Sequence, residues 1–186
     1  MRRYLASWTG VLVLAALLGL PGGALGDNLT AGLRFAMGWS QRGNITIYSL
    51  QPRYGFYLLR PGGTALGNLG VSLVLEGTFS IADAPRGTGS EVGVAPLLRL
   101  SFPFSSLVTF FIEGGVGIIL ENIDSPAIPH TLNFTPQVGT GLDFKFMPRM
   151  TATAAYRFRH SSNASLYDDN PAFNVHVLQV GLNYQF

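Results

Sequence analysis

Apolar and polar residues alternate in the C-terminal stretch Leu178-Gln179-Val180-Gly181-Leu182-Asn183-Tyr184-Gln185-Phe186. Successive side chains of a β-strand point to opposite faces, so this period of two collects the apolar residues on one wall of a sheet. Glutamine, asparagine and glycine collect on the other wall. The stretch therefore predicts a strand with one apolar and one polar face.

The same alternation recurs along the chain. Segment 132–146, for example, sets Leu142 and Phe144 against Asp143 and Lys145. Eight segments show or tolerate the pattern, and we predict strands at roughly 28–39, 47–59, 68–80, 90–102, 107–120, 132–146, 149–162 and 174–186. No internal repeat or composition shift suggests a second domain.

The polar wall of these strands carries glycine together with charged residues. In a soluble sandwich that wall would face water, whereas the cramped, polar lumen of a narrow barrel suits both residue types. Buried charges need partners. We therefore predict an all-β, eight-stranded antiparallel transmembrane β-barrel, with the following residues paired in its lumen: Arg34, Glu76, Glu91, Arg99, Glu113, Asp143, Lys145, Arg157 and Arg159.

The predicted connections alternate in length. Pro103 to Ser106 and Met147-Pro148 form tight turns, whereas Ala82 to Gly89, Asn122 to Thr131 and Asn163 to Phe173 form longer polar loops. Short turns at one end and longer loops at the other are usual in bacterial barrels. A small pore is disfavoured because eight strands enclose mainly side chains.

Residues 1–26 have the features of a secretory signal peptide. Arg2 and Arg3 precede the apolar run Gly10–Leu20, and Ala24-Leu25-Gly26 offers a small-x-small cleavage site. The alternative, a retained membrane anchor, would need about 20 apolar residues. We predict cleavage of 1–26 and a mature barrel domain of residues 27–186.

Charge and cysteine content exclude several functions. Removing Arg2 and Arg3 from the 12 basic residues leaves 10 basic against 10 acidic, so nucleic-acid binding has no compositional support. Cysteine is absent, which excludes a cysteine nucleophile and thiolate metal sites.

Two reactive side chains continue an apolar stripe at the end of segment 149–162. Tyr156 and Phe158 lie in phase on the outward wall, and the next two positions in phase are His160 and Ser162. Neighbours on one face of a strand are about 7 Å apart at the backbone. A histidine near a serine can take the hydroxyl proton and return it to a leaving group.

The residues around this pair match a known pattern: Arg159-His160-Ser161-Ser162-Asn163-Ala164, then Asn170-Pro171, then Gly181-Leu182-Asn183-Tyr184-Gln185-Phe186. This resembles the lipid A 3-O-deacylase (PagL-like) family of outer-membrane enzymes. The family pattern has a His-x-Ser-Asn motif on the penultimate strand, a loop asparagine, and an acid at the start of the last strand. The match is specific over residues 155–186 and architectural elsewhere.

The resemblance implies a role for each matching residue. His160 would be the general base and Ser162 the nucleophile on an ester carbonyl. Asn170 would help to stabilise the oxyanion, with a backbone N–H between Asn163 and Ser165 as a second donor. Asn163 would shape the loop or contact the substrate.

The chain departs from the family at the acid, because Asn174 stands where a glutamate would orient the histidine. An amide can accept a hydrogen bond from the imidazole but supplies no negative charge. We expect Asn174 to be a neutral orienting group, paired across from Ser162 with His176 across from His160. The alternative is an acid from the loop, Asp168 or Asp169.

His176 is predicted on the same outward wall, near His160. It could serve as a headgroup contact, an alternative base or an ordinary rim residue, and the rim residue is the favoured interpretation. Two imidazoles without further ligands do not make a metal site.

The resemblance implies an ester hydrolase that removes an acyl chain from lipid A of lipopolysaccharide in the bacterial outer membrane, without cofactor or metal. Its partners would be lipopolysaccharide, outer-membrane lipids and the barrel assembly machinery, with a homodimer left open. The alternative function is a non-catalytic structural or adhesive barrel that keeps the motif without the activity.

Overall fold

A computed structural model of the protein describes residues 28–42, 44–62 and 67–186. Eight strands form in this part of the chain: β1 (Leu29–Ser40), β2 (Ile45–Leu59), β3 (Gly70–Ala84), β4 (Gly87–Pro103), β5 (Val108–Asn122), β6 (Leu132–Met147), β7 (Met150–Ser161) and β8 (Phe173–Gln185). No helix among the described residues is long and apolar enough to span a membrane. The predicted signal peptide, residues 1–26, lies outside the described residues.

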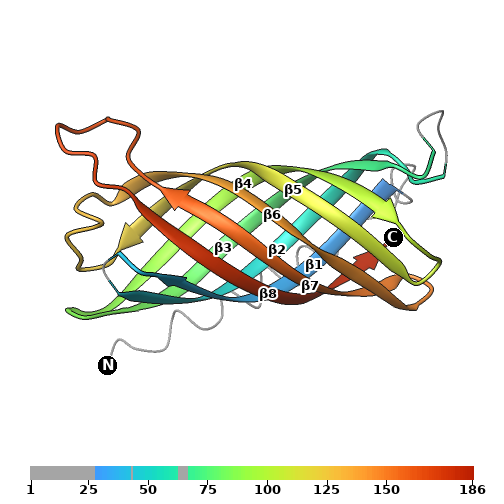
Figure 1. The fold of residues 1–186 in the computed structure, drawn as a ribbon, viewed down its shortest axis with the longest axis horizontal. Helices are drawn as coiled ribbons and strands as arrows, with labels where there is room; N and C mark the ends of the chain where they lie inside the picture. Colours follow the sequence, from blue (N-terminus) through green and yellow to red (C-terminus); the bar gives the residue numbers. More distant parts are fainter. Residues whose placement is uncertain (1–27, 43, 63–66) are drawn as a thin grey trace, which may run out of the picture.

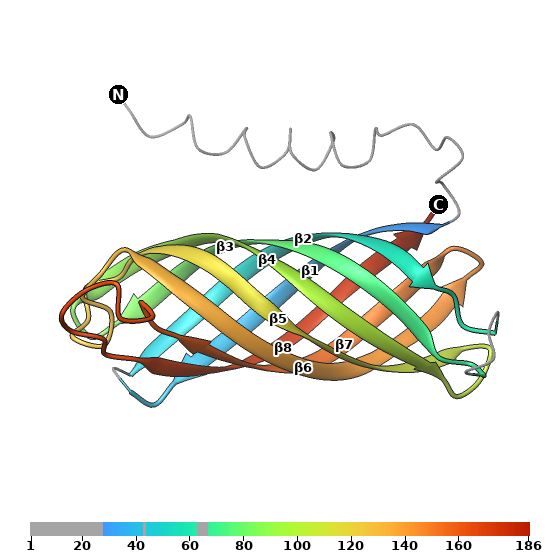
Figure 2. The same cartoon turned by 90° about the horizontal axis from the view of Figure 1, so that it is seen from above.

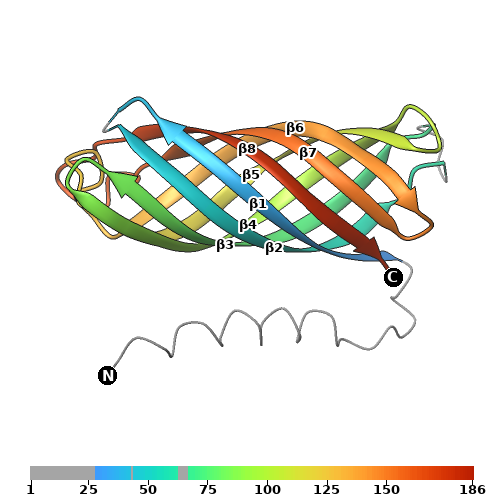
Figure 3. The ribbon, with the colours of Figure 1, turned by 90° about the horizontal axis from the view of Figure 1, so that it is seen from below.

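The strands close into a single antiparallel barrel. Each strand pairs with the next along the chain, and β1 closes the barrel by pairing with β8, from Thr30 opposite Gln185 to Trp39 opposite His176. The three ribbon views show the strands tilted around one long axis (Figures 1, 2 and 3). The predicted fold class is confirmed, because closure pairs both edges of the sheet and leaves no unpaired strand.

The barrel is charged inside and apolar outside. Arg34 and Glu76 are fully buried, whereas Phe35 on the same strand as Arg34 is 62% exposed and Val180 is 61% exposed. This reverses the distribution of a soluble protein and suits a wall that faces lipid. The alternation in the sequence therefore assigned the two walls correctly.

Glu113 stands at the centre of the lumen network. Its carboxylate accepts hydrogen bonds from Arg34 at 2.8 Å, Arg53 at 2.7 Å and Arg157 at 2.6 Å. Glu76 also pairs with Arg53 at 2.7 Å and with Arg157. These ion pairs join strands on opposite sides of the barrel and fill its middle.

Two further pairs extend the network toward the barrel ends. Arg99 pairs with Asp143, and Arg159 pairs with Glu91 at 2.8 Å. Lys145 was predicted to pair in the lumen, but it is exposed and makes no ion pair within the described part of the chain. It lies two residues before Met147, the last residue of β6, and an exposed charge needs no buried partner.

The prediction also missed Arg53, which is buried and bonded to both central glutamates. β2 carries apolar residues on both walls, with Ile45 and Ile47 buried inside and Tyr48 and Leu50 exposed outside. The alternation is therefore weak in this strand, and the lumen position of Arg53 is decided by its pairing with β3.

Two long loops share one end of the barrel. They are residues 123–131, between β5 and β6, and residues 162–172, between β7 and β8, and they lie together at the left of Figure 1, opposite the C-terminus. The predicted long loop from Ala82 to Gly89 is wrong: β3 and β4 continue to a tight turn at Pro85-Arg86, followed by Gly87 with φ 135°. At the other end, the connection 60–69 is longer than the predicted short turns.

Candidate active site

The C-terminal end of β7 places His160 on the outer wall, and the next residue in phase, Ser162, follows the strand directly. Arg159 and Ser161 are buried in the lumen, while His160 and Ser162 are partly exposed. β7 ends at Ser161, and the backbone of Ser162 pairs with Phe134 of β6 through two hydrogen bonds of 2.7 and 3.1 Å. Both side chains thus share the wall that the alternation predicted, and β6 fixes the backbone of Ser162.

Asn174 orients the imidazole of His160. The two residues face each other across β7 and β8, and His160 Nδ1 lies 2.8 Å from Asn174 Oδ1. An amide oxygen can only accept, so Nδ1 donates in this contact, and in the neutral imidazole Nε2 is the nitrogen with the free lone pair. This is the protonation state that a general base next to a serine requires.

The register of this hairpin differs from the predicted one. We expected Asn174 opposite Ser162 and His176 opposite His160, but Asn174 lies opposite His160 and His176 opposite Phe158. The ladder between β7 and β8 stops at the buried pair Ser161–Phe173, and Ser162 turns to β6 instead. The observed register brings Asn174 nearer to the imidazole than the predicted one.

Asn163 organises the loop that follows Ser162. Its buried side chain donates from Nδ2 to the carbonyl of Asp169 at 2.7 Å and accepts at Oδ1 from the N–H of Ser165 at 2.9 Å. Its own N–H donates to Oδ1 of Asn170 at 3.1 Å. Both predicted asparagines therefore meet in one hydrogen-bonded loop beside Ser162.

The backbone N–H of Ala164 lies in a strained part of this loop. Ala164 and Ser165 both adopt left-handed conformations, with φ 53° and 62°. The N–H groups of Asn163 and Ser165 are used within the loop, whereas that of Ala164 makes no hydrogen bond to any residue that the structure describes. Of the three predicted backbone donors, Ala164 N–H is the one left for a substrate oxygen.

Neighbouring loops hold the 162–172 loop from two sides. Arg42 donates to the carbonyl of Ala172 at 2.6 Å. His130, from the β5–β6 loop, lies 2.5 Å from Asp169 and stacks on Tyr167 with ring centroids 3.8 Å apart. The hydrogen bond from His130 lowers the pKa of Asp169 below its ordinary value.

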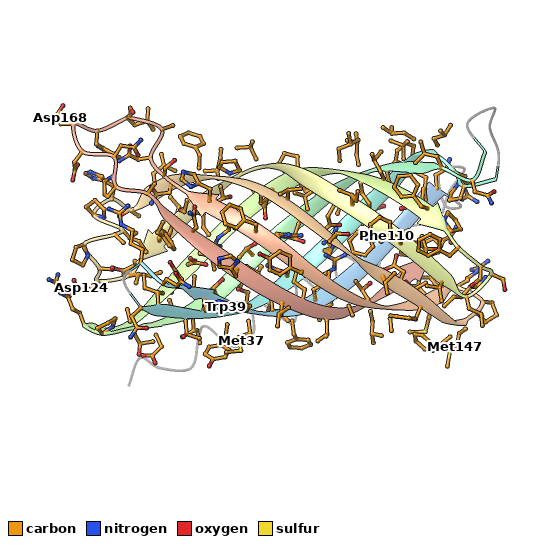
Figure 4. The ribbon with its side chains drawn as sticks, viewed as in Figure 1. Met37, Trp39, Phe110, Asp124, Met147 and Asp168 are labelled. Carbon is orange, nitrogen blue, oxygen red and sulfur yellow. The ribbon has the colours of Figure 1, made fainter. Side chains whose placement is uncertain are left out.

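These contacts rule out the loop acids as orienting groups for His160 in this structure. The carboxylate of Asp169 is engaged by His130. Asp168 is exposed at the outer tip of the loop, where Figure 4 labels it. Asn174 is therefore the group that contacts the imidazole.

His176 belongs to an aromatic cluster on the outer wall. Its Nδ1 lies 2.7 Å from the hydroxyl of Tyr156, its ring stacks on Trp39 with centroids 5.7 Å apart, and the Phe158 ring packs against it in a T-shaped arrangement with centroids 5.5 Å apart. Trp39, labelled in Figure 4, lies near the end of β1 and is 37% exposed. His176 is thus partnered by Tyr156 and not by His160.

The sequence pattern did not indicate His130 and Arg42 as supports of the site. Both lie in loops far from the motif along the chain, 30 or more positions before His160. No periodic pattern marks a loop residue that acts through a contact with another loop. The only available signal was that His130 is one of three histidines in the chain.

Comparison with known proteins identifies the family of this chain and supports its fold. The family profile described as lipid A 3-O-deacylase (PagL) matches residues 27–183. No curated protein sequence matches the chain. Among solved structures, the outer membrane enzyme PagL aligns with a TM-score of 0.66 at 18% identity, covering 81% of this chain and 97% of that one.

A surface protein and an attachment protein align as well. Neisserial surface protein A gives a TM-score of 0.59 at 14% identity over 85% of this chain and 96% of its own. The attachment invasion locus protein Ail of Yersinia pestis gives 0.52 at 16% identity over 85% and 96%. At these identities the likeness establishes the barrel fold, while the family profile covers the barrel and the motif together. The chain therefore belongs to the lipid A 3-O-deacylase (PagL) family of the bacterial outer membrane.

Proposed function

We propose that this protein is a serine ester hydrolase that removes an acyl chain from lipid A, with Ser162 as nucleophile and His160 as general base. The observation that carries the proposal is the 2.8 Å contact between His160 Nδ1 and Asn174 Oδ1, which leaves Nε2 available as a base. Ser162 lies two residues further along the same lipid-facing wall. Membership of the deacylase family supports the substrate class.

The proposed reaction has two steps. Ser162 Oγ attacks the ester carbonyl as its proton passes to His160 Nε2, and the sugar oxygen then leaves with that proton. In the second step water attacks the acyl-serine, His160 takes a proton from the water, and Ser162 Oγ leaves as the hydroxyl. The products are a free fatty acid and a lipid A hydroxyl group.

The oxyanion that forms in each step needs donors. Ala164 N–H has no partner among the described residues, and Asn170 Nδ2 makes only a long contact of 3.4 Å with Ser165 Oγ. Both groups therefore keep hydrogen-bonding capacity for a substrate oxygen. Removing one such donor typically lowers kcat by about 100-fold to 1000-fold.

The position of the pair on the outer wall suits a lipid substrate. Lipid A would reach Ser162 by lateral diffusion, with its acyl chains lying on apolar wall residues such as Tyr156 and Leu178, which are 38% and 54% exposed. Longer loops of bacterial barrels face the cell exterior, where lipopolysaccharide forms the outer leaflet. The ester would then meet the rim that carries the 162–172 loop.

A direct assay tests the proposal. The mature chain, folded in detergent, is incubated with purified lipid A, and mass spectrometry follows the loss of one acyl chain. We expect cleavage by the wild type and none by Ser162→Ala or His160→Ala. Ser161→Ala is the matched control, because Ser161 lies next to Ser162 but points into the lumen, where it bonds to Glu121 at 2.7 Å.

The folded Ser161→Ala protein should cleave lipid A as the wild type does. If Ser162→Ala cleaves lipid A as fast as the wild type, the serine mechanism is wrong. If the folded wild type leaves lipid A intact, the chain is the alternative, a non-catalytic structural or adhesive barrel that keeps the motif.

A further inference from the structure

The exposed part of the 162–172 loop contacts a histidine from the β5–β6 loop. We propose that His130 is a positioning residue for the hydrolysis, acting on the asparagines beside Ser162 through Asp169. This inference rests on the proposed function. His130 lies 32 residues before Ser162 and is outside the motif.

His130 makes two different contacts with the loop. Its Nε2 lies 2.5 Å from Asp169 Oδ1, and its ring stacks on Tyr167 with centroids 3.8 Å apart and planes 15° apart. A hydrogen bond and a ring stack together fix both the distance and the orientation of the loop. Few contacts replace them, because residues 164–170 are all exposed.

The contact at Asp169 continues to the reacting groups. The carbonyl of Asp169 accepts from Asn163 Nδ2 at 2.7 Å, and the next residue, Asn170, accepts from Asn163 N–H at 3.1 Å. Asn163 directly follows Ser162, and Ala164 follows Asn163. Holding Asp169 therefore holds the two proposed oxyanion donors, Ala164 N–H and the Asn170 side chain.

The other side of His130 is anchored to the barrel wall. The carbonyl of His130 accepts a 2.9 Å hydrogen bond from the side chain of Asn133, which is buried in β6. Phe134, the next residue of β6, pairs with the backbone of Ser162. The hydrogen bonds from Asn133 to His130, from His130 to Asp169 and from Asn163 to Asp169 form a chain that we call the brace. Its first residue, Asn133, precedes Phe134 on β6, and its last, Asn163, follows Ser162, which pairs with Phe134.

A brace of this kind acts on the transition state more than on substrate binding. The acyl chains are proposed to lie on the apolar wall, whereas His130 contacts the loop that carries the proposed oxyanion donors. A displacement of about 1 Å in such donors can lower the rate about 100-fold. Loss of His130 should therefore lower kcat and leave KM nearly unchanged.

The kinetic test compares three variants of the full mature barrel on lipid A in detergent. His130→Ala should lower kcat by about 10-fold to 100-fold, with KM within about twofold of the wild type. His130→Gln keeps a donor near Asp169 and should recover part of the loss. Arg86→Ala is the control, since the exposed Arg86 pairs at 3.5 Å with Asp124 of the same β5–β6 loop but does not touch the 162–172 loop.

The proposal is overturned if His130→Ala keeps the wild-type kcat, or if Arg86→Ala loses as much. Hydrogen exchange read by mass spectrometry supplies a second measurement that does not depend on activity. His130→Ala should accelerate exchange in peptides covering residues 163–170, where the N–H groups of Asn163 and Ser165 are bonded. Unchanged exchange would also overturn it, even if wild-type protein cleaves no ester and the proposed function fails.

Discussion

His160 donates its Nδ1 proton to the side-chain oxygen of Asn174, directly across the β7–β8 ladder at 2.8 Å. The contact gives the imidazole the tautomer of a general base without any charge to stabilise the imidazolium that forms during the reaction. In a triad, the third residue supplies both. In this chain Asn174 orients the imidazole of His160 but supplies no negative charge.

Replacing Asn174 with glutamate should therefore raise activity. The carboxylate would keep the hydrogen bond to Nδ1 and add electrostatic stabilisation of the charged imidazole, so we expect kcat on lipid A to rise at least about tenfold. Asn174→Ala, which removes the acceptor, should lower kcat. The comparison is made by acyl-chain release, and equal rates for all three proteins would show that this position does not act on the histidine.

His176 should be dispensable for the chemistry. Its Nδ1 is bonded to Tyr156 at 2.7 Å and its ring stacks on Trp39, so it supports the aromatic cluster of the outer wall and not Ser162. His176→Phe keeps a ring in that cluster, and kcat should stay within about threefold of the wild type. A loss as large as that of His160→Ala would instead identify His176 as a second base.

Glu113 should dominate the stability of the lumen. Its carboxylate is 2% exposed and bonds to Arg34, Arg53 and Arg157. Glu113→Gln would leave buried guanidinium groups without their shared counter-charge, and we expect the free energy of unfolding to fall by about 3–5 kcal/mol. Urea unfolding in detergent, followed by tryptophan fluorescence, measures the change.

Lys145→Gln is the control for that experiment, since Lys145 is exposed near the end of β6. Its free energy of unfolding should stay within about 0.5 kcal/mol of the wild type. Similar losses for both variants would mean that the central network contributes no more than a surface charge.

The Asp169 carboxyl should titrate below the ordinary aspartate value of 3.8, because His130 bonds to its ionised form. A lowered pKa in the folded protein means that the contact stabilises the loop above the ordinary value and is lost as the pH falls through the lowered one. Carbon-detected NMR of the side chain measures the titration. In His130→Ala the pKa should return toward 3.8, and an unchanged value would show that His130 is not the cause.

The two-residue periodicity of the sequence was sufficient to predict the barrel and to predict which wall carries His160 and Ser162. A strand that spans lipid must alternate, so the sequence of β7 by itself assigned Arg157 and Arg159 to the lumen and His160 and Ser162 to the outer wall. Periodicity did not place Arg53 in the lumen, because β2 carries apolar residues on both walls and its alternation is weak.

The sequence by itself determined which side chains share a wall, because that depends only on the two-residue period of the strand. Only the tertiary structure decided which of them meet across strands and loops. Register placed Asn174 opposite His160, and packing between two loops brought His130 to Asp169. Such contacts depend on how hairpins end and how loops fold over the barrel rim, and no periodicity along one strand encodes them.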